Sequence, residues 1–122
     1  MKYVVALALI TVTNFAGAAC SLSDIKISSM NAKFINKCSS SECFYMHGVA
    51  VLENSCAEPI GVQVQIIAYD KSGSPVATSE AWPASTRNIP PGRYTFSLDH
   101  YLDYEPSITH FDLKPIEVNQ WR

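Results

Sequence analysis

The stretch VQVQIIAY, residues 62–69, decides the fold, because apolar and polar side chains alternate along it. A period of two residues is typical of a half-buried β-strand, whereas an amphipathic helix repeats every three to four residues. No stretch beyond the apolar N-terminal segment keeps a helical spacing. The pattern therefore predicts a strand with these residues facing the core: Val62, Val64, Ile66 and Ala68.

Turn residues follow this strand directly. Residues 70–75 read DKSGSP, in which Gly73 tolerates a positive φ and the Asp70 carboxylate can accept bonds from the amides ahead of it. Further strands are expected near 25–35, with a bulge at Ser28-Ser29, and at 43–53, 76–82, 93–98, 108–113 and 116–118. The last two are expected to be separated by Lys114-Pro115, where the proline implies a break or an edge strand.

Short strands with regular turn signals are typical of a sandwich. We therefore expect an all-β protein, a small immunoglobulin-like antiparallel β-sandwich of six to eight strands with two disulfides. In that fold Tyr94, Phe96 and Leu98 would share the buried face of one strand. We detect no internal repeat and no linker.

The N-terminus has the three parts of a secretory signal: the basic Lys2, an apolar run at 4–10 and small residues at 16–19. This predicts a signal peptide over 1–18, cleaved near 18/19 or 19/20, and a single domain over 20–122. The apolar run is too short for the roughly 20 residues that span a bilayer. An alternative is a lipid anchor on Cys20, although Gly17 stands where lipoprotein signals usually have leucine.

All four cysteines follow the expected signal, and an even number in an exported chain indicates two disulfides. Of the three possible connectivities, we favour Cys38 with Cys43 and Cys20 with Cys56, because the segments around 39–42 resemble the arms of one hairpin. A lipid on Cys20 would leave one cysteine unpaired. The expected location is therefore secreted or periplasmic, with the lipoprotein as the alternative.

The formal net charge of −2 comes without a basic patch, so no nucleic-acid partner is expected. A membrane would be a partner only if Cys20 carried a lipid.

Residues 48–96 resemble the FxLYD domain, an immunoglobulin-like module of bacterial exported proteins and lipoproteins. The resemblance lies in GVAVLENS at 48–55, IIAYD at 66–70, KSGSPVAT at 71–78 and IPPGRYTF at 89–96. Ile66 and Ala68 stand at the signature Phe and Leu positions, and the cysteines are outside the family's usual pattern. The resemblance implies this fold and export, but no shared activity or ligand.

No serine lies in a strained, glycine-flanked turn and no free thiol is expected, so we predict no enzyme and no cofactor. Three histidines, His47, His100 and His110, support an alternative function as a periplasmic metal or small-ligand carrier. Adjacent strand residues point to opposite faces of a sheet, so Met46 and His47 cannot easily coordinate the same ion. We therefore predict no metal site.

The loop at 99–106, DHYLDYEP, is the most unusual segment, because tyrosines and charges are crowded between two strands. Tyrosine-rich loops on rigid sandwiches make binding surfaces, but the same rings could instead cover the ends of the core. We predict an exported, non-enzymatic binding or assembly module whose partner is a protein or an envelope component. The candidate binding residues are Tyr101, Tyr104, His100, Asp103 and Trp82.

Overall fold

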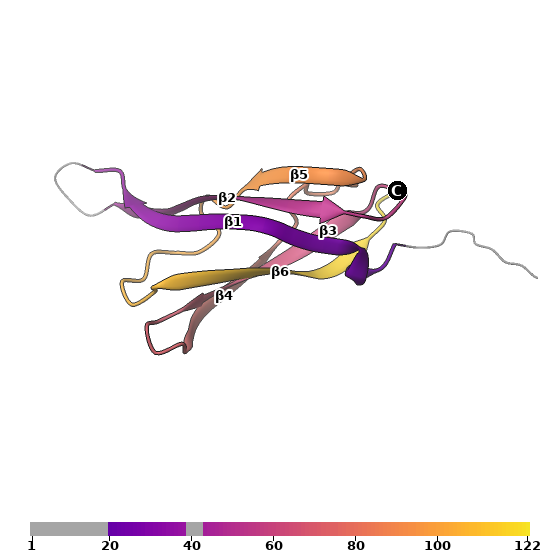
Figure 1. Cartoon of the computed structure of the whole chain (residues 1–122). Coiled ribbons are helices and arrows are strands. Elements are labelled where there is room, and N and C mark those ends of the chain that lie inside the picture. The colour runs from indigo at the N-terminus through magenta and orange to yellow at the C-terminus, as the bar shows by residue number, and fades with distance from the viewer. Residues whose placement is uncertain (1–19, 39–42) are drawn as a thin grey trace, which may run out of the picture.

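The computed structural model describes residues 20–38 and 43–122, which form two antiparallel sheets packed face to face (Figure 1). The predicted signal peptide and its cleavage positions lie outside the described residues. Among the described residues, no helix is long and apolar enough to cross a membrane. The elements are η1 (Leu22–Asp24), β1 (Ile25–Asn36), β2 (Phe44–Asn54), β3 (Gly61–Tyr69), β4 (Pro75–Ala81), β5 (Gly92–Ser97) and β6 (His110–Asn119).

Each sheet has three strands, in the orders β1-β2-β5 and β4-β3-β6. The all-β class, the antiparallel pairing and a strand number of six are thus confirmed. Strand β3 lies at the centre of its sheet with Val62, Val64, Ile66 and Ala68 buried, as the alternation predicted. They pack against residues of β2 such as Leu52 in one apolar core. Burying a Val, Leu or Ile side chain contributes about 1.5–3 kcal/mol.

The predicted bulge in β1 is confirmed, because its pairing with β2 shifts register between Ile27 and Ser29. Of the break or edge expected at Lys114-Pro115, the edge is confirmed, whereas the break is wrong, since β6 is one strand from His110 to Asn119. Strand β6 is an edge strand, and its pairing with β3 shifts register between Gln63 and Val64, where Pro115 stands opposite Val64. A proline is tolerated there because it interrupts the ladder only at an edge and a bulge.

The turn between β3 and β4 follows the predicted mechanism. Asp70 Oδ1 accepts hydrogen bonds from the amides of Ser72 (2.9 Å) and Ser74 (3.0 Å), and Gly73 has a φ of +86°. The hydrogen bond from the Ser72 hydroxyl is the main cause of a lowered pKa at Asp70. The ring of Tyr69 stacks on His110 at 4.8 Å between centroids.

Both predicted disulfides are confirmed. Cys20–Cys56 ties the start of the described chain to the β2–β3 loop, and Cys38–Cys43 closes the β1–β2 hairpin. Disulfides persist in oxidising compartments, so the pair indicates an extracellular or periplasmic setting.

The two long sides of the sandwich differ. On the filled side, β1 and β6 contact each other across the sheets, and Phe34 meets Phe111 with ring centroids 5.6 Å apart. On the open side, β4 directs only Ala77, Ser79 and Ala81 toward the core, since these residues pair with inward-facing residues of β3. Segment 98–109, which connects β5 to β6, covers part of this gap.

Candidate functional site

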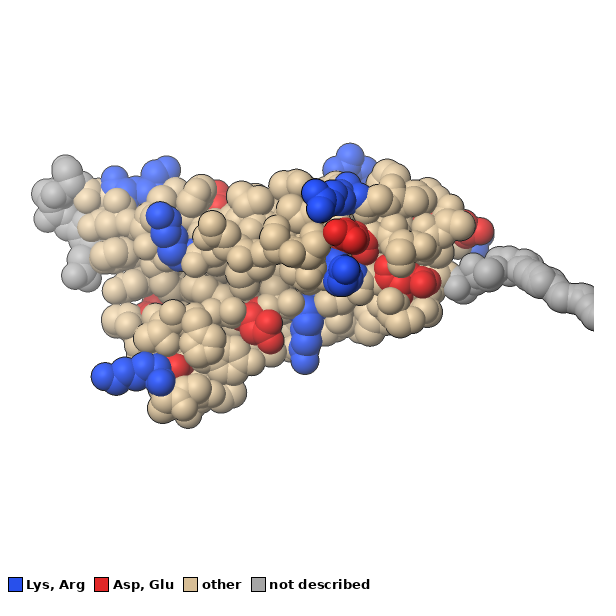
Figure 2. Space-filling model, viewed as in Figure 1, with Lys and Arg blue, Asp and Glu red and all other residues tan. Residues whose placement is uncertain are grey.

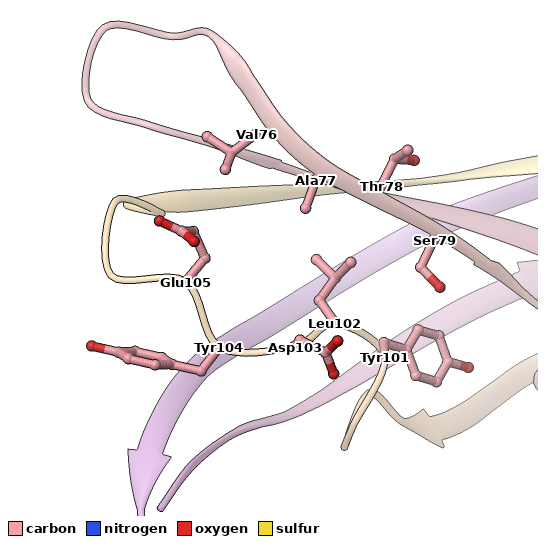
Figure 3. Close-up of a pocket in the computed structure, with 9 residues that line it drawn as sticks. All are labelled: Val76, Ala77, Thr78, Ser79, Tyr101, Leu102, Asp103, Tyr104 and Glu105. Carbon is pink, nitrogen blue, oxygen red and sulfur yellow. The ribbon is translucent and has the colours of Figure 1, made fainter. Parts of the chain in front are cut away.

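A cleft of about 380 Å³ lies on the open side, between β4 and the connection from β5 to β6 (Figure 3). It contains three of the five predicted binding residues, Tyr101, Asp103 and Tyr104. The other lining residues are Val76, Ala77, Thr78, Ser79, Leu102 and Glu105.

Small side chains create the cleft. Ala77 and Ser79 point from β4 toward the loop, and Leu102 points back toward β4, as Figure 3 shows. Leu102 is 7% exposed and belongs to the core, but the two small residues opposite it leave space unfilled. Thr78 points away from the loop and also lines the cleft, so the cleft continues along the edge of β4.

Tyr101 is half-buried and packs against the core. Burial raises the pKa of its hydroxyl, with a smaller contribution from Tyr94. The amide of Tyr101 donates to the carbonyl of Leu98 (3.2 Å) in a tight turn. Tyr101 therefore both covers the core and forms a neutral, fixed part of the cleft wall.

Tyr104 is 38% exposed, and its position is set by aromatic contacts with the first hairpin. Its ring stacks on Phe44 at 4.3 Å between centroids and meets Phe34 edge-on at 5.1 Å. Aromatic pairs in these geometries stabilise by about 0.5–1.5 kcal/mol beyond their buried area. Tyr104 is thus a rigid wall of the cleft with one accessible surface.

Two carboxylates give the cleft its charge. Asp103 and Glu105 are both exposed, and Glu105 Oε2 accepts a hydrogen bond from the Ser107 hydroxyl (3.1 Å). The ion pairs of the described chain involve Asp99 and Glu53 instead, so neither of the two carboxylates forms an ion pair there. On the face shown in Figure 2, by contrast, positive and negative side chains are interspersed.

His100 lies away from the cleft wall. It has a φ of +66°, is exposed, and stacks on the ring of Tyr45 with centroids 4.9 Å apart. Its amide donates to the carbonyl of Met46 (3.1 Å), so it fastens the start of the loop to β2.

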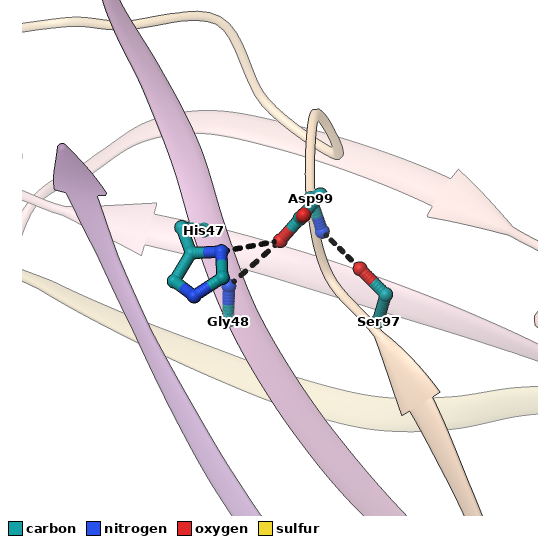
Figure 4. A network of polar contacts seen from close by, with 4 residues as sticks. All are labelled: His47, Gly48, Ser97 and Asp99. Carbon is teal, nitrogen blue, oxygen red and sulfur yellow. Dashed lines mark hydrogen bonds and ion pairs between the residues drawn. The ribbon is translucent and has the colours of Figure 1, made fainter. Parts of the chain in front are cut away.

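Asp99 is the second anchor of the loop (Figure 4). Its Oδ1 lies 3.0 Å from His47 Nδ1 and accepts a 3.1 Å hydrogen bond from the amide of Gly48, while its own amide donates to Ser97 Oγ (3.0 Å). The Gly48 hydrogen bond is the main cause of a lowered pKa at Asp99, and the charge of His47 adds to it. In the part of the chain that the structure describes, no hydroxyl or thiol is hydrogen-bonded to His47 as a nucleophile would be.

The histidines are not assembled into a metal site among residues 20–38 and 43–122, where no group of three His, Cys, Asp or Glu side chains is placed to hold an ion. Met46 is fully buried while the His47 side chain is 47% exposed, so the two face opposite ways as predicted. His110 lies in the other sheet, against Tyr69.

Trp82 comes directly after β4, at the end of the strand opposite to Val76, and does not line the cleft. It meets Trp121 at 5.2 Å between ring centroids, and two hydrogen bonds between Asn88 and the backbone of Trp121 hold that end of the chain. Sequence reasoning missed the β4 wall of the cleft. The signal was present in the small residues at alternate positions, Ala77, Ser79 and Ala81.

Comparison with known proteins adds no relative: no family model, no curated protein and no solved structure matches the chain. The resemblance of residues 48–96 to the FxLYD domain stays a prediction. The fold and the cleft are therefore the basis on which a function can be proposed.

Proposed function

We propose that the chain is an exported, non-enzymatic binding or assembly module of the bacterial envelope, built on an FxLYD-type immunoglobulin-like domain. The observation that supports this proposal is the cleft between β4 and residues 101–105, which has aromatic walls and two carboxylates that form no ion pair among the described residues.

The cleft belongs to a rigid frame, which suits binding. Leu102 is fixed in the core, Tyr104 is stacked on Phe44, and Asp99 and His100 fasten the start of the loop to β2. A surface held in place before its partner arrives loses little conformational entropy on association. Tyrosines on such a frame provide large contact area at low entropic cost.

Export is supported by the two disulfides, which require an oxidising compartment in most organisms. The Cys20–Cys56 bond uses the sulfur atom that a lipid anchor would need. This favours a secreted or periplasmic protein without an anchor.

Filling the cleft tests the proposal. In Ala77→Leu and, separately, Ser79→Leu, the larger side chain would occupy the space opposite Leu102. We expect each variant to capture its partner from an envelope extract at least about tenfold less than the wild type, since a blocked cleft loses most of its binding energy.

The matched control is Thr95→Leu, which adds the same side chain at an exposed position of β5 outside the cleft. It should capture as the wild type does. Melting temperatures identify any variant that fails to fold. Equal capture by folded Ala77→Leu, Ser79→Leu and wild-type protein would reject the cleft as the binding site.

A further inference from the structure

Strand β4 has an unpaired edge beside the cleft. In the described chain β4 pairs with β3 alone, so its other side is free of strand partners. In antiparallel pairing, alternate residues direct their N–H and C=O groups to the same side. Every second residue of β4 therefore offers both groups to an incoming strand. Because Ala77 and Thr78 both line the cleft, this edge borders it.

Two other edge strands carry features that discourage strand addition. Strand β1 has a bulge after Ile27 and lysines at 26 and 33, and β6 has Pro115 beside a register shift. Lysines, prolines and bulges are common protections of exposed edges. The pairing of β4 with β3 is regular from Ala77 to Ala81, and that segment has neither lysine nor proline. Its edge remains suited to another strand.

Charge indicates what kind of strand fits. The described residues that line the cleft include Asp103 and Glu105 but no lysine or arginine, and Glu80 is exposed on β4 itself. Lys33 lines the adjoining hollow with Glu105, on the side of that residue away from the β4 residues that line the cleft. A strand beside β4 that carries cations toward the loop would neutralise these carboxylates. A second copy of this chain paired through β4 would bring the acidic clefts together, and like charges across strands destabilise the pairing.

We infer that the partner enters as an extended peptide segment that adds to β4 as a further strand, with lysine or arginine side chains facing Asp103 and Glu105. This inference rests on the proposed function, and it names the chemistry of the partner. Main-chain hydrogen bonds to β4 would provide affinity, and alternate side chains in and over the cleft would provide specificity. Small apolar side chains would occupy the space opposite Leu102.

A synthetic array of eight-residue peptides, randomised at every position, tests this inference with the purified oxidised protein. We expect the bound peptides to be enriched at least about threefold in lysine and arginine at alternate positions. Asp103→Asn/Glu105→Gln should abolish that enrichment, because it removes both charges from exposed positions. Binding of a selected peptide should shift the amide NMR signals of residues 76–81, and N-methylation of alternate peptide amides should weaken binding at least about tenfold.

The outcomes separate the two proposals. If no peptide binds, or if bound peptides lack basic residues, strand addition by a basic segment is wrong. In that case loss of partner capture in Ala77→Leu would still support the cleft as a binding site. If β4 amide signals shift with protein concentration alone, a second copy occupies the edge and the peptide proposal is overturned. Binding that is insensitive to N-methylation would overturn it as well.

Discussion

The filled and open sides of the sandwich differ in how closely the facing edge strands approach each other and in the size of their side chains. Between β1 and β6 large side chains, including Phe34 and Phe111, close the core, and surface hollows of about 320 and 360 Å³ lie beside them. Beside β4 the corresponding inward positions carry Ala77 and Ser79, and Leu102 from a connecting loop fills only part of the gap.

This difference shows where such a domain can offer a binding site for a partner without destabilising its hydrophobic core. Close packing throughout would leave no space for a partner, and a large void would destabilise the fold. Placing small residues on one edge strand and covering them with an anchored loop leaves a cleft without opening the centre. The filled side is therefore expected to be sensitive to added volume, and the open side to tolerate it.

Among substitutions that add a side chain, the largest effect is expected for Gly48→Ala on β2, whose partner β1 forms the filled side. A Cβ at position 48 would meet the carbonyl oxygen of Asn31 and lie 2.8 Å from the Cα of Ala32. Both atoms belong to the backbone, so β1 would have to move away from β2. We expect a loss of about 3 kcal/mol in the free energy of unfolding, measured with urea.

Gly73→Ala is the matched control. A Cβ there meets nothing within 4 Å, although the φ of +86° is strained for alanine. The expected loss is about 1 kcal/mol. A cost at Gly73 equal to that at Gly48 would show that backbone conformation, and not the close approach of β1, decides the result.

Leu102→Ala on the open side should have an intermediate effect. Leu102 is buried, but the space left by its truncation would join the cleft, which water can enter. We expect a loss of about 2 kcal/mol, the low end for a buried leucine, against about 4 kcal/mol for Ile66→Ala in the closed centre of β3. Equal losses in urea unfolding would mean that Leu102 is packed as closely as Ile66 in the centre of the core.

The features of the fold that depend on local sequence patterns were predictable. The alternation in 62–69, the bulge near Ser28 and both cysteine pairs depend on near neighbours or on one hairpin, and all agree with the structure. The sequence left open whether Pro115 breaks a strand or lies on an edge strand, because that choice depends on the strand's place in the sheet.

The cleft shows the same limit. Tyr101, Asp103 and Tyr104 were identified by an unusual loop composition, and they do line one wall. Ala77 and Ser79 form the opposite wall only because β4 faces the loop, and the sequence alone does not show which strand faces it. The position of Trp82 outside the cleft depends on the same strand arrangement. Sequence patterns mark unusual residues, whereas their neighbours across the sandwich follow from the topology.

The smallest effect on the free energy of unfolding is expected for Asp99→Asn, which changes a residue that anchors the loop over the open side. The lowered pKa of Asp99 means that its carboxylate loses its proton more readily in the folded state than in the unfolded chain. Its stabilising contribution is therefore present above the ordinary aspartate pKa of about 4, and is lost as the pH falls through the lower folded value. In Asp99→Asn this contribution is absent at every pH. The difference in unfolding free energy between wild type and variant should shrink as the pH is lowered from 6 to below about 4, whereas the loss caused by Leu102→Ala should not depend on pH. A constant difference for Asp99→Asn would mean that the bonds to Gly48 and His47 do not fasten the loop.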